Sequence, residues 1–403
     1  MSRIGIYGGS FNPVHKGHVL AAREFMRLLK LDRLLLIPAN DPPHKMLPAF
    51  TPPPADRFDL LSAAMRDIPG VTVSDLELKR EGKSYSIDTL EAIHAENPTD
   101  ELFLLMGSDM LLSFETWKRF ESLFALATLG VLCRMDRNEK ERAILETCAD
   151  RFRAQYGAKI ILLENQRIEV SSTTARRMLF FGCGEDYVPR PVFDAIRKKG
   201  LYGTAGNYRN LPTSELTKTA LSLYDAKRVP HAIGCAETAR KLAEKYGADP
   251  FLAERAGILH DVTKALRAQE QLRLCEKYGI MTGEYSGTQT KLLHGKTAAA
   301  IAKHVFGECD DVCEAISWHT TGKANMTTLE KIIYLADYIE PNRAFDGVDK
   351  MRALAQNDLN AAVLLGMEDT IRILREQGRP LNRYTVEARD YLLLERETNE
   401  TDQ

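Results

Sequence analysis

The chain has 403 residues, of which 44% are hydrophobic and 27% are charged, and its formal net charge is −2. These values are typical of globular domains with sizeable cores, and the length suits two or three domains. The balanced charge argues against partners such as nucleic acid or an anionic membrane surface. The seven cysteines show no CxxC spacing, which favours reduced thiols and a cytoplasmic protein. We expect neither a signal peptide nor a membrane span, because an apolar strand begins at once and no apolar run reaches roughly 18 residues.

The first 200 residues alternate between strand-like and helix-like segments. Short apolar runs predict strands over 4–7, 34–38, 71–76, 102–106, 129–133 and 160–163. Periodic segments between them predict helices, including 56–65 and 87–96. This order favours a doubly wound, Rossmann-like α/β sheet, in which ligands bind at the carboxyl ends of the strands. Four residues lie just past predicted strands and are expected to share one cleft: His18, Asn40, Gly107 and Ser171.

The character of the sequence changes near residue 203. Residues 203–212 are rich in turn formers and are predicted to be a linker. Strand signals then nearly vanish, and helices are predicted over 213–227, 231–246, 250–260, 292–306, 309–317, 328–338 and 361–375. We therefore expect an α/β domain over 1–202, an all-α domain over 213–390, and a polar tail over 391–403 that is frayed over 395–403.

The first predicted strand runs into Gly8-Gly9-Ser10-Phe11-Asn12-Pro13-Val14-His15-Lys16-Gly17-His18. Glycines let backbone N–H groups approach an anion, and a helix beginning near His18 would add its positive end. Two imidazoles at the same point can donate to phosphate oxygens. The stretch is typical of a site that stabilises a polyphosphate during phosphoryl or nucleotidyl transfer. A structural glycine turn with incidental histidines is the alternative.

A second phosphate site is predicted near the end of this domain, over 170–176. A strand ends there, hydroxyl residues can cap a helix, and Arg176 follows one turn later. Helix-terminal N–H groups and a guanidinium together bind phosphate strongly. The simpler interpretation is a serine N-cap with a surface arginine.

Two stretches between these motifs bear on a second substrate. The sequence Pro42-Pro43-His44-Lys45 lies in a Pro-rich loop, which is either a plain surface loop or a mobile clamp that brings Lys45 onto phosphates. The segment 84–90 predicts a helix start, with Ser86 as the cap and Asp88 in the first turn.

The sequence after the central predicted strand offers two more candidates. Asp109 follows that strand, where a carboxylate can accept hydrogen bonds from ribose hydroxyls. Trp117 lies a few residues further on. A tryptophan there is either part of the core or a platform for an aromatic ligand.

The opening motif resembles the signature of the HxGH nucleotidyltransferase superfamily. Together with Pro42-Pro43-His44-Lys45, the 84–90 segment and Val170-Ser-Ser-Thr-Thr-Ala-Arg176, it resembles the nicotinate mononucleotide adenylyltransferases over residues 1 to about 202. The resemblance implies the reaction of ATP with nicotinate mononucleotide to give deamido-NAD and pyrophosphate. In that reaction the mononucleotide phosphate attacks the α-phosphorus directly, and Mg²⁺ screens the triphosphate.

The resemblance also implies roles for individual residues. The implied catalytic residues of this half are His15, His18, Lys45 and Arg176. The implied ATP contacts are Gly8, Gly9, Ser10, Phe11, His15, His18, Ser172, Thr173 and Arg176. The implied nicotinate mononucleotide contacts are His44, Lys45, Tyr85, Ser86, Asp109 and Trp117. Ser86 stands where threonine is usual in the family, so a backbone contact would survive this change better than a side-chain contact.

Histidines and aspartates recur on separate predicted helices of the second half, at His231, His260, Asp261, His294, His319 and Asp337. Neutral imidazoles and carboxylates are ligands for zinc, manganese or iron. Asp261 could bridge two ions, an arrangement suited to hydrolysis of phosphoesters or phosphoanhydrides. A lone helical histidine is more often structural, and we assign that role to His304, which lies outside the pattern.

This spacing resembles the HD phosphohydrolase superfamily. The flanking sequences at 257–264, 293–295, 318–322 and 334–341 resemble the bacterial HD-type symmetrical diadenosine tetraphosphatases, over residues 213 to 390. The resemblance implies cleavage of diadenosine tetraphosphate to two ADP at a dinuclear site of iron, with manganese or zinc as alternatives. It implies that the six residues are ligands, that Asp261 is catalytic, and that the substrate phosphates contact Lys264, Thr320 and Arg343.

We therefore expect a bifunctional cytoplasmic enzyme whose partners are ATP, nicotinate mononucleotide and diadenosine tetraphosphate, and a homo-oligomer is compatible with the sequence. Two alternatives stay open. The second domain could act on another nucleotide, such as a guanosine alarmone or a mononucleotide. Either half could instead be a nucleotide-binding regulatory module without turnover.

Overall fold

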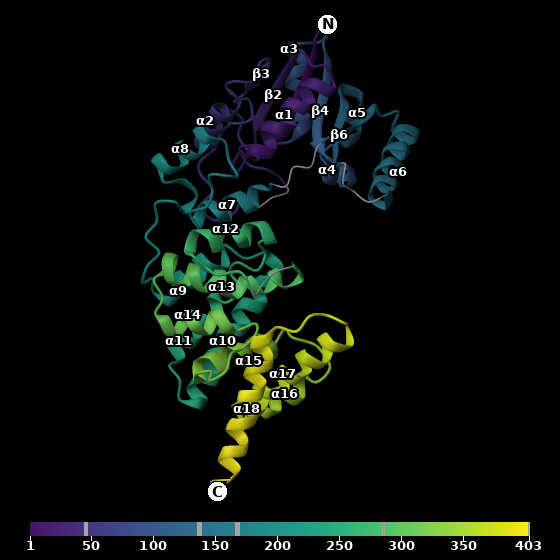
Figure 1. Ribbon diagram of the computed structural model, residues 1–403. Helices are drawn as coiled ribbons and strands as arrows, with labels where there is room; N and C mark the ends of the chain where they lie inside the picture. The colour runs from purple at the N-terminus through teal and green to yellow at the C-terminus, as the bar shows by residue number, and fades with distance from the viewer. Residues whose placement is uncertain (44–46, 135–138, 166–169, 284, 286, 402–403) are drawn as a thin grey trace. The chain divides into compact units, whose positions relative to one another are not determined.

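The computed structural model describes residues 1–43, 47–134, 139–165, 170–283, 285 and 287–401. The chain divides into two compact units, Met1–Gly206 and Asn207–Gln403 (Figure 1). The division falls inside the segment expected to be a linker. Within the described residues, no helix is both long enough and apolar enough to cross a membrane.

Unit 1 is built on a parallel sheet of six strands in the order β3-β2-β1-β4-β5-β6. The strands are β1 Arg3–Gly9, β2 Arg33–Pro38, β3 Val71–Val73, β4 Glu101–Gly107, β5 Thr128–Arg134 and β6 Ile160–Asn165. This order confirms the expected doubly wound fold. The direction of winding reverses between β1 and β4, so a crevice forms beyond the carboxyl ends of these two strands.

The strand expected over 71–76 is shorter than predicted and ends at Val73. The backbone then turns, because the carbonyl of Asp75 accepts hydrogen bonds from the N–H groups of Leu78 and Lys79. Alternating hydrophobicity therefore overestimated this edge strand.

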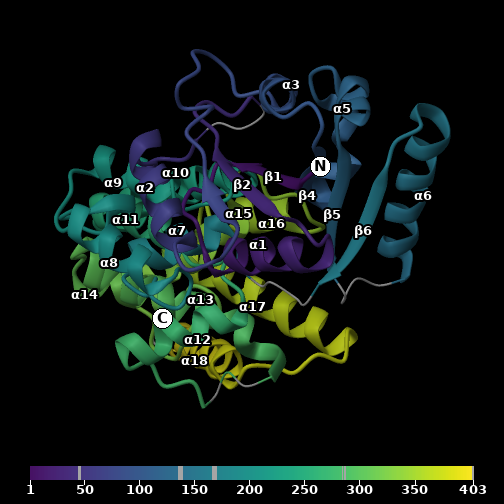
Figure 2. The same cartoon turned by 90° about the horizontal axis from the view of Figure 1, so that it is seen from above.

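Helices cover both faces of the sheet, with α1 on one side and α3 and α5 on the other (Figure 2). The α-helices are α1 Lys16–Leu28, α2 Pro54–Met65, α3 Ser86–Glu96, α4 Ser108–Leu112, α5 Phe120–Leu126, α6 Glu139–Tyr156, α7 Ser172–Phe180 and α8 Arg190–Lys199. The short 3₁₀ helices are η1 Phe114–Thr116 and η2 Leu201–Gly203. Gly130 on β5 allows the end of α1 to approach closely, because a Cβ there would lie 2.9 Å from Leu29.

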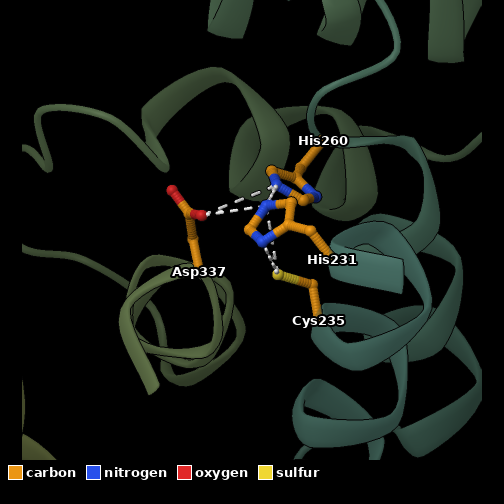
Figure 3. Close-up of side chains that lie close together, drawn as sticks. All are labelled: His231, Cys235, His260 and Asp337. Carbon is orange, nitrogen blue, oxygen red and sulfur yellow. Dashed lines mark hydrogen bonds and ion pairs between the residues drawn. The ribbon is translucent and has the colours of Figure 1, made fainter. Parts of the chain in front are cut away.

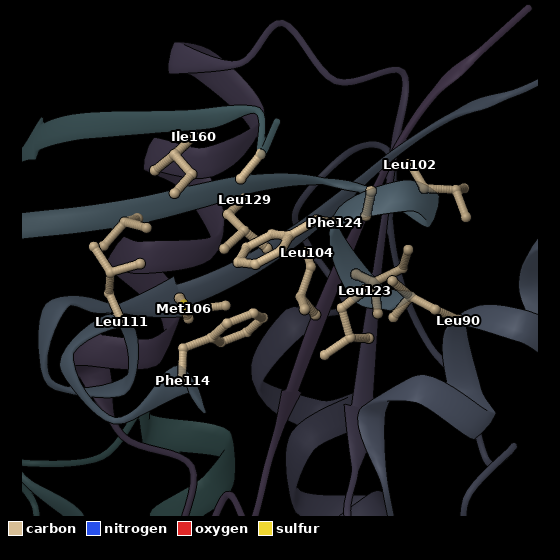
Figure 4. Packing of buried hydrophobic residues seen from close by; sticks show 14 of the residues in the cluster. Leu90, Leu102, Leu104, Met106, Leu111, Phe114, Leu123, Phe124, Leu129 and Ile160 are labelled. Atoms are coloured by element: carbon tan, nitrogen blue, oxygen red, sulfur yellow. The ribbon is translucent and has the colours of Figure 1, made fainter. Parts of the chain in front are cut away.

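The core on the other face joins alternate residues of the central strands to α3, η1 and α5 (Figure 4). Leu104 and Met106 of β4 and Leu129 of β5 belong to this cluster together with Phe114 and Phe124. Full burial of each such side chain contributes on the order of 1.5–3 kcal/mol. This packing fixes the strands whose carboxyl ends carry the site.

Unit 2 consists of helices. They are α9 Thr213–Leu221, η3 Ala226–Arg228, α10 Val229–Tyr246, α11 Pro250–Leu259, α12 Ala268–Tyr278, η4 Gly287–Leu292, α13 Leu293–Ile301, η5 Ala302–Phe306, α14 Asp310–Trp318, α15 Thr328–Ile339, α16 Val348–Leu354, α17 Leu359–Glu376 and α18 Arg383–Thr401. The predicted helices are present, whereas α12, α16 and α18 were not predicted.

The polar tail expected over 391–403, with fraying from residue 395, is helical instead, because α18 continues to Thr401. Leu392 and Ala388 of α18 are buried, and Glu395 forms an ion pair with Lys331 at 3.2 Å. Burial of one apolar edge thus orders a segment whose composition is mostly polar.

Helices α10 and α11 cross closely at Gly257. A Cβ on Gly257 would lie 2.7 Å from the Cα of Ala236, so a larger residue would force the helices apart. This close approach brings His260, at the end of α11, beside His231 in the first turn of α10.

Candidate active sites

The phosphate loop of unit 1 begins later than expected. Gly8 and Gly9 are the last residues of β1 rather than a turn, and the chain leaves the strand at Ser10. A Cβ on Gly8 would meet no atom within 4 Å, so the space above this residue is open. Phe11 is buried with a φ of 41°, and its ring lies 5.0 Å from the ring of His18. The loop is therefore anchored by an aromatic side chain and open at the strand end.

The two histidines of the motif stack at the start of α1, with ring centroids 3.7 Å apart. The backbone N–H of His15 donates to Nδ1 of His18 over 3.2 Å. Burial lowers the pKa of His15 to about 4, so this imidazole is neutral at pH 7. Its Nδ1 has no hydrogen-bond partner among the described residues. Both rings are thus placed at a helix N-terminus, where anions are stabilised.

The expected second phosphate stretch meets the first one. Helix α7 begins after Ser171, whose side chain accepts a hydrogen bond as the N-cap. The hydroxyl of Ser172 donates to the carbonyl of Pro13 over 3.1 Å, and Nη1 of Arg176 donates to the carbonyl of Asn12 over 2.5 Å. Segments near the start and near the end of unit 1 therefore meet at one loop. The sequence predicted neither of these two hydrogen bonds.

A pocket of about 310 Å³ lies beside this loop. It is lined by Gly8, Gly9, Ser10, Ala39, Pro42, Pro43, Glu77, Ser84, Tyr85, Ser86, Leu104, Leu105, Met110, Trp117, Lys118 and Leu123. Residues predicted to contact ATP and residues predicted to contact the mononucleotide thus share one pocket. Its lining is mainly apolar with a few polar groups, which suits an aromatic ligand.

Tyr85, rather than Ser86, is the N-cap of α3, and Ser86 is the first helical residue. The predicted cap is therefore wrong by one position, while Asp88 does lie in the first turn. The positive end of α3 opens into the pocket beside Lys118, whose Nζ lies 4.3 Å from the centre of the Tyr85 ring. The charge of Lys118 is already paired with the carboxylate of Asp88, whose Oδ2 lies 3.3 Å from Nζ, so it is the helix N-terminus that favours an anionic ligand group.

Trp117 packs against the core and also lines the pocket. One part of its half-buried ring system packs 5.0 Å from Phe114 of the core, and the residue also lines the pocket. Asp109 lies in the first turn of α4, is exposed and does not line the pocket. The predicted contacts of His44 and Lys45 lie outside the described residues.

All six predicted ligands of unit 2 converge, and Figure 3 shows three of them. Nε2 of His231 lies 3.3 Å from Nε2 of His260 and 3.2 Å from Oδ1 of Asp337. Nε2 of His294 lies 3.2 Å from Nε2 of His319. The side chains come from α10, α13 and α15 and from the residues that end α11 and α14. The cluster therefore has two halves, each containing a pair of histidines.

Asp261 lies between these halves. Its Oδ2 lies 3.3 Å from Nε2 of His260 and 3.5 Å from Nε2 of His231. Its Oδ1 lies 3.1 Å from Nε2 of His294 and 3.5 Å from Nε2 of His319. Burial alone would raise the pKa of this carboxyl, but the surrounding imidazoles outweigh it and hold the pKa well below its usual range. Each oxygen faces one half, as a bridging carboxylate would.

The outer nitrogens of the four imidazoles are all engaged. Three Nδ1 atoms donate over 2.5–2.7 Å to the carbonyl three residues earlier, in the pairs His260 with Gly257, His294 with Lys291, and His319 with Ile316. The Nδ1 of His231 contacts Glu340 at 3.1 Å. Burial would lower the pKa of His231, but Asp261, Asp337 and Glu340 outweigh it and raise the pKa to about 9, so this ring must lose its Nε2 proton before it can bind a metal. In the neutral tautomer that the Nδ1 bonds select, every Nε2 would present a lone pair to the cluster. Lone pairs and carboxylate oxygens converge there, and this donor set fits divalent iron, manganese or zinc.

Cations surround the cluster as well. Nζ of Lys264 lies 3.3 Å from Oδ1 of Asp261, and Arg343 pairs with the carboxylate of Asp337. Lys264 and Arg343, which were predicted to contact phosphates, thus pair with two of the expected ligand carboxylates. Thr320, the third predicted phosphate contact, follows His319 and is half-buried.

Three residues near the cluster were missed by sequence reasoning. Nε of Arg228 donates to Oδ2 of Asp261 over 3.0 Å, and Sγ of Cys235 lies 3.7 Å from Nε2 of His231. Glu340 is 1% exposed and orients His231. Arg228 and Cys235 lie three residues before and four after His231, so helical spacing was the available signal.

Fold and sites together define a nucleotidyltransferase unit joined to an HD-type metal-dependent hydrolase unit. Residues 6–178 match the cytidylyltransferase-like family, and residues 228–342 match the HD domain family. A Syntrophotalea carbinolica protein named as a nicotinate-nucleotide adenylyltransferase is 38% identical over 212 residues, which are 50% of this chain and 97% of that protein. A Halalkalibacterium halodurans protein named as a symmetrical bis(5'-nucleosyl)-tetraphosphatase is 42% identical over 169 residues, which are 42% of this chain and 90% of that protein.

The chain belongs to the nicotinate-nucleotide adenylyltransferase family through its first half and to the HD-type symmetrical bis(5'-nucleosyl)-tetraphosphatase family through its second. A further relative joins both halves. A Mycoplasma genitalium protein named as a nicotinate-nucleotide adenylyltransferase/Ap4A hydrolase is 27% identical over 384 residues, which are 93% of this chain and 99% of that protein.

Proposed function

We propose that the chain is a bifunctional enzyme. Unit 1 transfers the adenylyl group of ATP to nicotinate mononucleotide, and unit 2 hydrolyses diadenosine tetraphosphate to two ADP. The observation that carries this proposal is the presence of one candidate site within each unit, on a chain whose halves belong to families with these names. All seven cysteines are free, which supports a reducing, cytoplasmic location.

In unit 1, a phosphate oxygen of the mononucleotide attacks the α-phosphorus of ATP. The bond from that phosphorus to the bridging oxygen breaks, and pyrophosphate leaves with the electron pair. We propose that the N-termini of α1 and α7, together with His18 and Arg176, stabilise the negative charge that develops on the phosphates. Such preorganised donors account for most of the rate in reactions that need no covalent intermediate. Mg²⁺ enters this site as part of the nucleotide substrate.

The pocket supports a nicotinate rather than a nicotinamide group. Trp117 offers an aromatic surface, and the positive end of α3 favours a carboxylate over a neutral amide. We further propose that Lys45 reaches the phosphates, that His44 contacts the mononucleotide, and that Asp109 binds a ribose.

In unit 2, the six-residue cluster would hold two divalent ions, with Asp261 shared between them. When bound, such ions supply Lewis acidity toward phosphate oxygens and lower the pKa of water. Arg228 and Lys264 already lie at the cluster, and a substrate phosphate would draw these cations away from the Asp261 carboxylate. We propose iron as the native metal. Four imidazoles and two carboxylates suit iron, and they suit manganese and zinc as well.

Two parallel assays test the proposal on the purified full-length chain. With ATP and Mg²⁺, nicotinate mononucleotide should give deamido-NAD, and nicotinamide mononucleotide should react at least about tenfold less efficiently, because one lost charge contact costs on the order of 1.5–3 kcal/mol. Diadenosine tetraphosphate should give ADP alone. Formation of AMP with ATP would contradict symmetrical cleavage. Metal analysis of anaerobically purified protein tests the iron assignment.

A further inference from the structure

Arg57 on α2 has the largest side chain among the fully buried residues, with 0% exposure. No carboxylate among the described residues forms an ion pair with it. A buried charge without a counter-ion is costly unless its donors are satisfied. An arginine in this place therefore needs a compensating benefit to the protein.

The guanidinium of Arg57 binds three backbone carbonyls. Nη1 donates to Ser10 over 2.7 Å, and Nη2 donates to Ala39 over 2.8 Å and to Asn40 over 3.3 Å. Ser10 follows β1 and Ala39 follows β2, and both residues line the pocket. The guanidinium of Arg57 thus forms hydrogen bonds with residues just past the carboxyl ends of both β1 and β2, at the edge of the sheet where the substrates are proposed to bind.

A second arginine holds the same loop two residues later, because Arg176 donates to the carbonyl of Asn12. Phe11, between the two held carbonyls, has a positive φ of 41° and is buried. A non-glycine residue in this conformation persists only where its surroundings fix it. The two guanidinium groups, one from α2 and one from α7, supply that restraint.

Among the residues that the structure describes, no acidic group forms an ion pair with Arg57 or Arg176. Burial lowers the pKa of Arg57 and of Arg176, yet an arginine side chain stays protonated in proteins. Two uncancelled positive charges behind the loop raise the potential where a triphosphate would lie.

We propose that Arg57 is a positioning residue for adenylyl transfer. It fixes the loop from Ser10 onward, so that the loop backbone and His18 meet the triphosphate, and its charge strengthens nucleotide binding. This role rests on the function proposed for unit 1.

The test compares Arg57→Lys with Arg57→Met in the full-length chain. Lysine keeps the charge but cannot span three carbonyls, so kcat should fall about 10–100-fold with less than about a threefold change in KM for ATP, since small displacements cost this much in rate. Methionine loses both contributions, and KM for ATP should rise about tenfold in addition. Tyr202→Phe is the matched control, because Tyr202 is buried close to Arg57 but its hydroxyl bonds to no described residue.

Hydrolysis by unit 2 in each variant shows that the chain is intact, and thermal unfolding reports on unit 1. Should Arg57→Met fail to fold, Arg57→Lys alone decides the question. If the wild type is active and Arg57→Lys has an unchanged kcat, the proposed role of Arg57 is wrong. A wild type that makes no deamido-NAD would instead contradict the proposed function of unit 1, and this role with it.

Discussion

The backbone N–H of His15 donates to Nδ1 of His18 over 3.2 Å. Because Nδ1 accepts this bond, the neutral imidazole of His18 carries its proton on Nε2, the nitrogen farther from the backbone. The fold of the loop thus selects the tautomer that can donate a hydrogen bond to a phosphate oxygen. Donation of this kind needs no metal, whereas the histidines of unit 2 present lone pairs.

A first prediction follows for substitutions at His18. Glutamine can place an amide N–H near the position of Nε2, whereas asparagine places it near Nδ1. Loss of one donor to the developing charge lowers kcat on the order of 10²–10³-fold. We expect His18→Asn to show this full loss and His18→Gln to retain at least about tenfold more activity. Steady-state deamido-NAD formation measures both, and equal activities would show that the tautomer is irrelevant.

A second prediction concerns His15 and pH. Its pKa is about 4 in the folded chain because of burial, against 6.5 for an ordinary histidine. Between these values the unfolded chain binds the extra proton, so the free energy of unfolding falls as the pH drops from 6.5 toward 4. The full effect is about 3 kcal/mol. We expect His15→Gln to lack this loss.

Urea denaturation at pH 7, 5.5 and 4.5 measures the difference. Trp117 is one of two tryptophans, so a Trp318→Phe background makes its fluorescence report on unit 1 alone. The difference in unfolding free energy between wild type and His15→Gln should shrink steadily toward low pH. Parallel curves would mean that His15 is accessible to protons in the folded state.

A third prediction concerns Glu340, which orients His231 through Nδ1. Replacing a group that orients a metal ligand typically weakens metal binding 10–100-fold. We expect Glu340→Gln to weaken Mn²⁺ binding in this range, measured by calorimetry on the metal-free chain. Glu244→Gln is the control, because Glu244 lies on α10 like His231 but pairs with Arg240 and is exposed. Equal affinities in both variants would remove Glu340 from the metal site.

A fourth prediction separates the two units by metal removal. Chelation followed by desalting should lower hydrolysis about 100-fold or more, because a hydrolase of this kind depends on its ions. Adenylyl transfer should persist once Mg²⁺ is returned with ATP. Anaerobic Fe²⁺ or Mn²⁺ should restore hydrolysis and raise the unfolding temperature of the chain. Hydrolysis that survives complete metal removal would refute the assigned site.

The elements that the sequence predicts best are those with strong apolar periods. The central strands β1, β4 and β5 are continuous apolar runs and appear where expected. The edge strand β3 was predicted too long, and α18 was predicted as a tail. In α18, local composition was outweighed by tertiary contacts such as those of Leu392, whereas β3 is shortened by the local turn at Asp75.

The site residues, like the elements of the fold, include some that the sequence predicts and some that it does not. Motif residues such as His260 and Asp261 were found because their chemistry and spacing are distinctive. Arg57 and Glu340 were not found, because their importance lies in what they hold: backbone carbonyls for one and a histidine ring for the other. Sequence patterns record residue types at fixed spacings, whereas such supporting contacts join positions 47 and 109 residues apart.

The central claim is that one chain carries two independent sites of opposite chemistry. Its most direct test measures both activities in wild type, His18→Ala and His260→Ala. We expect His18→Ala to lose deamido-NAD formation about 10²-fold or more while hydrolysing diadenosine tetraphosphate normally. His260→Ala should lose hydrolysis and bound metal while retaining adenylyl transfer. Loss of both activities in either variant, or of neither, would contradict the account.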